Sequence, residues 1–106
     1  MAVIKSGTQI LMDYNKARKE ADRLDKAASS VRKEARRFET CRGNVAAAWK
    51  GENAVRFTRK MDLVYDDLDK IAKSLERAAD VIRTNAKLIY DAEMEAKRIA
   101  ESRTYM

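Results

Sequence analysis

The sequence predicts an all-α fold, an antiparallel two-helix hairpin that dimerises into a four-helix bundle. Three observations support this prediction. The 106 residues include no proline and only three glycines, and alanine and charged residues are abundant, which favours long helices. Apolar residues recur at alternating steps of four and three in both halves of the chain, which is heptad spacing. A single short break, residues 49–52, separates the two periodic stretches.

The first helix is expected over residues 7–48. Its apolar row is rich in alanine, and Arg42 is its only polar member. A β-strand would need steps of two, which the row does not have. The row consists of Ile10, Tyr14, Ala17, Ala21, Leu24, Ala28, Val31, Ala35, Phe38, Arg42, Val45 and Trp49.

The ends of the first helix carry recognisable signals. Ser6 and Gln9 have the spacing of a capping box with Ser6 as the N-cap, and Thr8 is a rival N-cap. Gly43–Asn44 has the composition of a C-cap and could end the helix early. Because the apolar row continues to Trp49, we expect the helix to pass through these two residues.

The second helix is expected over residues 53–102. Its row has bulkier members, with Asn85 as the one polar residue. A buried Asn in such a row fixes register or partner choice, and a hydrated Asn at a thin end of the bundle is the other interpretation; both stay open. The row consists of Ala54, Phe57, Met61, Val64, Leu68, Ile71, Leu75, Ala78, Ile82, Asn85, Ile89, Ala92, Ala96 and Ile99.

The face of the second helix is too wide for one partner helix. We expect the alanines of the first row to face the large residues of the second, and further apolar positions flank that second row. A dimer of hairpins would cover this width, whereas an isolated hairpin with exposed alanines is the alternative. The predicted hairpin or dimer seam is Leu68, Ile71, Leu75, Ile82, Asn85 and Ile89. The flanking positions are Tyr65, Ala72, Ala79 and Ala86 on one side and Val81 and Leu88 on the other.

The chain is expected to form a single helical-hairpin domain over residues 1–106, with a turn at residues 49–52. The second helix is longer than the first, so about ten C-terminal residues lack a partner at 1.5 Å of rise per residue. We therefore expect a flexible C-terminal tail.

The composition argues against several functional classes. The chain has no histidine and one cysteine, Cys41, so a disulfide within the chain is impossible, and neither a metal site nor a cofactor is expected. It lacks a glycine-rich phosphate loop and a nucleophile elbow, so we do not expect an enzyme. Asp66, Asp67 and Asp69 point in different directions on a helix and are interpreted as a solvated face.

The net charge of +6 permits an anionic partner. The alternative function is therefore nucleic-acid binding through a basic helical face formed by Arg32, Lys33, Arg36 and Arg37. Acidic residues are interspersed nearly everywhere, and no aromatic residues alternate with the basic ones for base stacking. Nucleic acid is therefore not the expected partner.

The sequence shows no targeting or spanning segment. The first ten residues lack the apolar run of a signal peptide, and no stretch approaches the roughly 20 apolar residues that cross a bilayer. If the protein leaves the cell, we expect it to do so without a cleaved leader.

The break between the helices contains the only tryptophan, Trp49, and a glycine, Gly51. Gly51 lets the backbone reverse direction tightly, and Trp49 is large enough to cover the apolar end of the hairpin. Two interpretations follow: a structural cap alone, or a cap whose exposed edge is also a docking feature.

A Trp-x-Gly motif at the midpoint of a two-helix chain of about a hundred residues resembles the WXG family (early secreted antigenic target type). Phe57 also matches the aromatic residue that tends to follow the motif. The resemblance implies a non-enzymatic, virulence-associated substrate or adaptor of a type VII secretion system. It implies export without a cleaved signal peptide after a cytoplasmic stage. The implied partners are a second copy, a related WXG-type chain, a larger type VII effector and the secretion ATPase.

The resemblance also implies a composite export signal, made of Trp49 and Gly51 in one subunit and a C-terminal Tyr-x-x-x-Asp/Glu in its partner. Here Tyr90 has the expected place, but position 94 is Met, and Glu93 and Glu95 flank it. Tyr65 and Asp69 have the right spacing but lie in mid-helix, where we attribute the match to chance. The sequence thus predicts a degenerate tail signal at Tyr90, Glu93 and Glu95. The basic charge, unusual for the family, indicates an acidic partner.

Overall fold

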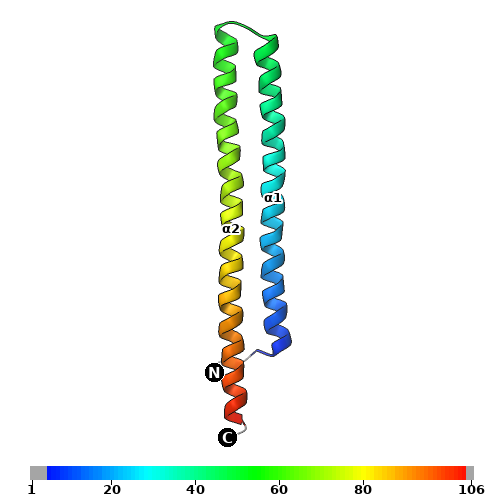
Figure 1. Cartoon of the computed structure of the whole chain (residues 1–106), viewed down its shortest axis with the longest axis vertical. Coiled ribbons are helices and arrows are strands. Elements are labelled where there is room, and N and C mark those ends of the chain that lie inside the picture. The colour runs from blue at the N-terminus through cyan, green and yellow to red at the C-terminus, as the bar shows by residue number, and fades with distance from the viewer. Residues whose placement is uncertain (1–4, 105–106) are drawn as a thin grey trace. The chain divides into compact units, whose positions relative to one another are not determined.

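The computed structural model describes residues 5–104, and these form two helices and no strand (Figure 1). Helix α1 spans Gly7–Ala48 and helix α2 spans Glu52–Thr104. The all-α, two-helix prediction is confirmed. The chain divides into two compact units, one formed by residues up to Arg23 with those from Ala78 onward, the other by Leu24–Arg77. We call them the terminal unit and the turn unit.

The turn unit is an antiparallel helical hairpin. It contains the second half of α1, the turn and the first part of α2, which lie side by side (Figure 1). The contact between the helices is made mostly by small residues, which let two backbones approach closely. The buried residues of this unit are Ala28, Ala35, Ala54, Thr58, Met61 and Ala72.

The terminal unit pairs the beginning of α1 with the last part of α2, again antiparallel (Figure 1). Ile10 is its largest fully buried side chain, and Ala21, Ala79 and Ala86 are buried with it. Alanine therefore dominates the helix contact in both units.

The N-terminal cap of α1 forms only half of the predicted capping box. The Gln9 backbone N–H donates to Ser6 Oγ at 3.1 Å, so Ser6 is the N-cap. The Gln9 side chain, however, donates forward to Asp13 at 2.8 Å rather than back to the cap.

The ends of the helices differ slightly from the expected bounds. Helix α1 passes through Gly43 and Asn44 without a break. Helix α2 begins one residue before the expected start and continues to Thr104, two residues beyond the expected end. The remainder of the expected flexible tail, residues 105–106, lies outside the described residues.

The expected pairing of small residues against the bulky row of α2 is wrong for part of that row: Leu68, Leu75 and Ile82 are half-buried, but three other predicted seam residues are exposed. Ala72, Ala79 and Ala86, interpreted from the sequence as flanking positions, are the buried ones. In contrast, Ile71 and Ile89 are 49% and 57% exposed, and Asn85 is exposed as well. Alanine at these inner positions permits a close approach of the two helices, and Ile71 and Ile89 are left facing outward.

Candidate functional site

The turn owes its shape to Gly51. The Trp49 N–H donates to Val45 O at 2.9 Å and closes the last turn of α1, and the Val55 N–H donates to Gly51 O at 3.1 Å at the start of α2. Between these two bonds Gly51 adopts a φ of 110°, a region that residues with a Cβ rarely adopt. The short reversal therefore requires glycine at this position.

Trp49 packs against Phe57 beside the turn and remains accessible. Its ring centroid lies 6.0 Å from that of Phe57 at an interplanar angle of 55°, so the two rings form a tilted pair across the turn. The Trp49 side chain is still 46% exposed. A shallow hollow beside it is lined by small and apolar residues together with Lys50 and Gly51. The other lining residues are Ala46, Ala54, Val55 and Thr58.

The tail tyrosine packs within its own chain. The Tyr90 ring lies 4.8 Å from the Tyr14 ring in the terminal unit. Cations lie near both rings: the Lys87 ammonium is 5.4 Å from the Tyr90 centroid, and the Arg18 guanidinium is 5.5 Å from the Tyr14 centroid. Tyr90 is therefore half-buried and faces α1.

The two tail glutamates have different environments. Glu93 is half-buried and accepts a hydrogen bond from Lys5 at 2.9 Å. Glu95 is exposed and pairs with Arg98 on the same helix, at 2.6 Å. The hydrogen bonds from Arg98 hold the pKa of Glu95 below its usual value.

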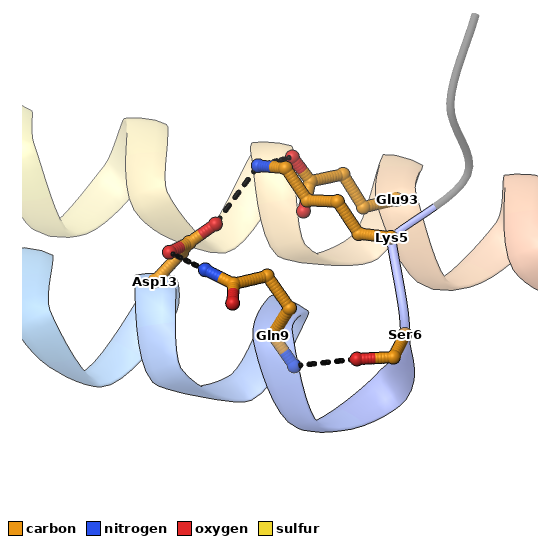
Figure 2. A network of polar contacts seen from close by, with 5 residues as sticks. All are labelled: Lys5, Ser6, Gln9, Asp13 and Glu93. Carbon is orange, nitrogen blue, oxygen red and sulfur yellow. Dashed lines mark hydrogen bonds and ion pairs between the residues drawn. The ribbon is translucent and has the colours of Figure 1, made fainter.

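Lys5, in the segment that precedes α1, contacts both α1 and α2 within the terminal unit (Figure 2). Its ammonium lies 2.8 Å from Asp13 on α1 and 2.9 Å from Glu93 on α2. The hydrogen bonds to Asp13 and then to Glu93 raise the pKa of Lys5, and the bond from Lys5 lowers the pKa of Asp13. No sequence pattern indicates this bridge, because it depends on the register of residues 88 positions apart.

We call the exposed large apolar members of the bulky row of α2 its outward row; they are Phe57, Val64, Ile71, Ile89 and Ile99. In the turn unit, Val64 and Ile71 are 43% and 49% exposed, while Leu68 and Leu75 are half-buried. In the terminal unit, Ile82 is half-buried, and the remaining large members are exposed. Those exposed members are Ile89 and Ile99, and the flanking residues Val81 and Leu88 are exposed as well.

The basic residues of α1 do not form a free cationic face. Arg32 is half-buried and donates to Asp69 and Glu76 on α2, at 3.1 Å in each case. Arg37 pairs with Glu34 on its own helix. Lys33 and Arg36 are exposed. The carboxylate of Asp69 therefore accepts a hydrogen bond from Arg32 within the turn unit.

The predicted site residues fall into different units. Trp49 and Gly51 belong to the turn unit, and Tyr90, Glu93 and Glu95 belong to the terminal unit. The described residues contain no group of three or more side chains suited to hold a metal ion. Neither helix, over the residues described, is long and apolar enough to cross a membrane.

Comparison with known proteins identifies the family. The searches of curated proteins and of solved structures gave no match. The family model described as WXG100, proteins of 100 residues with WXG, matches residues 9–94, which include the Trp49–Gly51 motif and Tyr90. Because the match covers well over half of the 106 residues, the chain belongs to the WXG100 family of small helical proteins associated with type VII secretion.

Proposed function

We propose that this protein acts in type VII secretion by pairing with a second helical hairpin, through the outward apolar row of α2. The second hairpin is another copy or a related WXG-type chain. The observation that carries the proposal is the exposure of Val64 and Ile71, which lie seven residues apart on one face of α2. A monomer would leave these side chains in water, whereas a second helix pair would bury them.

The proposal includes a role as export substrate or adaptor. Trp49 at the turn supplies an exposed aromatic edge for docking, and the tail residues Tyr90, Glu93 and Glu95 supply the degenerate signal. Because position 94 is Met rather than an acid, we favour export together with a larger effector that is presented to the secretion ATPase. The charge of +6 suits an acidic partner. Export of the chain by itself would instead indicate an independent substrate.

The nucleic-acid alternative receives less support. Arg32 is occupied by two acids of α2 and Arg37 by Glu34, so half of the four basic residues proposed for phosphate contact already have partners. Phosphate-driven binding would fall steeply with salt. Retention on a nucleic-acid column at physiological salt would revive this alternative.

Mutation of the outward row tests the pairing. We expect the Val64→Asp and Ile71→Asp variants to raise the Kd of the assembly by about 100-fold or more, because burying an unpaired carboxylate costs several kcal/mol. Light scattering on a sizing column, with nucleic acid removed, measures the mass of the purified chain and its variants.

Leu63→Asp is the matched control. Leu63 is 65% exposed but lies on a different face of α2, since one residue turns an α-helix by about 100° and Leu63 precedes Val64 by one residue. This variant should keep the mass of the parent chain. A parent chain that is monomeric alone would make the partner a related chain, and the same variants would then be tested on that complex. Equal behaviour of all three variants would refute the proposed face.

A further inference from the structure

Lys5 connects the start of α1 to the end of α2 through a chain of polar contacts (Figure 2). It precedes the N-cap Ser6, and its ammonium lies within hydrogen-bond distance of both Asp13 and Glu93, at 2.8 and 2.9 Å. The other oxygen of Asp13 accepts from the Gln9 side chain at 2.8 Å. The N-terminal cap of α1 and the tail glutamate on α2 are thereby joined through one lysine.

In the terminal unit, the contacts between α2 and α1 are mainly apolar up to Tyr90 and mainly polar after it. Ile10 and Ala86 are buried, and Tyr90 packs on Tyr14 at 4.8 Å. After Tyr90 no described residue of α2 is fully buried, and only Glu93, Lys97 and Ala100 are half-buried.

The contacts made after Tyr90 are therefore mainly polar. Lys5 holds Glu93, and the Lys97 side chain passes over Gly7, with its Cε 3.5 Å from where a Cβ of residue 7 would lie. Polar contacts between exposed groups are weak and are screened by salt. The last part of α2 is therefore attached to α1 far less firmly than the part before it, and it can detach locally.

We propose that Lys5 is a latch that holds the end of α2, from Asp91 onward, against the beginning of α1, and that this segment alternates between a latched and a released state. In the latched state the carboxylate of Glu93 is bound within the chain and is not available to a partner. Glu95, which pairs with Arg98 on the same helix, stays outside the latch in both states. The link to export rests on the proposed function, but the latch itself does not.

Hydrogen exchange of the purified full chain tests the latch without reference to export. In the Lys5→Gln and Glu93→Gln variants, amide exchange in peptides covering residues 91–104 should rise about two- to fivefold, the range expected for an exposed ion pair. Exchange in residues 54–72, in the other unit, should not change. Raising the salt concentration should accelerate exchange of the parent chain in the same segment and leave both variants nearly unaffected.

Two further variants decide whether the effect is specific. Lys19→Gln removes an exposed lysine of the same unit and should leave the exchange of residues 91–104 at the parent rate. Lys5→Arg keeps a cation between Asp13 and Glu93 and should keep most of the protection. If Lys5→Gln exchanges no faster than Lys19→Gln in this segment, or if Lys5→Arg exchanges as fast as Lys5→Gln, the latch is refuted.

Discussion

Two glycines of this chain lie eight residues apart but differ in what the backbone requires of them. Gly51 has a φ of 110° in the turn, a conformation that a side chain would strain. Gly43 lies inside α1 in ordinary helical geometry, and a Cβ added there would meet no heavy atom within 4 Å. Of these two glycines, only Gly51 is required by the backbone conformation of the fold.

This contrast gives a matched pair of substitutions. Gly51→Ala should lower the free energy of unfolding by about 1–2 kcal/mol, because a Cβ is strained at positive φ. Gly43→Ala should raise it by about 0.5–1 kcal/mol, because alanine loses less backbone entropy in a helix. Urea denaturation followed by circular dichroism measures both. Similar changes in the two variants would mean that the turn does not need the conformation seen at Gly51.

At the scale of the elements, the heptad pattern predicted where the helices lie better than which face each helix buries. For α1 a single apolar row exists, and its members Ile10, Ala21, Ala28 and Ala35 are buried as expected. For α2 two apolar rows overlap, and both follow heptad spacing. Periodicity cannot distinguish the row that contacts α1 from the row that faces outward, because both repeat every seven residues.

The ionic contacts between the two helices could not be predicted from the sequence. The contacts of Arg32 with Asp69 and Glu76 depend on how the two helices are aligned, and many alignments satisfy the same apolar repeat. Similarly, Arg42, the polar member of the first row, donates from its Nε to Asp62 Oδ1 on α2 at 2.8 Å. Such pairs become visible only once the register is known.

The group around Asp69 makes the stability of the turn unit depend on pH. Hydrogen bonds from Lys73 and then Arg32 hold the pKa of Asp69 below its usual value. Because the folded state favours the ionised carboxylate, its contribution is fully present above the unfolded pKa and is lost as the pH falls through the folded pKa. The melting temperature should therefore fall on acidification below about pH 4.

Thermal melts at decreasing pH, followed by circular dichroism, check this dependence. In Asp69→Asn the fall in melting temperature below about pH 4 should be smaller than in the parent chain, since one linked carboxylate is absent. Asp66→Asn, which changes an exposed aspartate of the same helix, serves as the control and should follow the parent curve. Identical curves for all three proteins would exclude Asp69 as a source of the pH dependence.

For the molecule as a whole, the buried apolar residues are too small to account for a stable isolated chain. Among the described residues, seven of the nine buried hydrophobic ones are alanine, and only Ile10 and Met61 are larger. Alanine contributes little apolar area, so the helix pair gains little from burial. Large apolar side chains such as Val64 and Ile71 are exposed on the outward row of α2, and a second chain packed there would add to the burial.

If the chain dimerises as proposed, its thermal stability must depend on protein concentration. Folding and association are then one equilibrium, and each tenfold increase in concentration should raise the melting temperature by roughly 3 °C for a dimer of this size. Calorimetry or circular dichroism over a hundredfold range of concentration measures the shift.

The Ile71→Asp variant supplies the control for this measurement. Because it weakens the pairing on which folding depends, it should melt at a lower temperature than the parent chain at every concentration in the range. A parent chain whose melting temperature is constant over the whole range would show that the alanine contact suffices for folding. The outward row of α2 would then serve only a different partner chain, and the same titration would be carried out with that partner present.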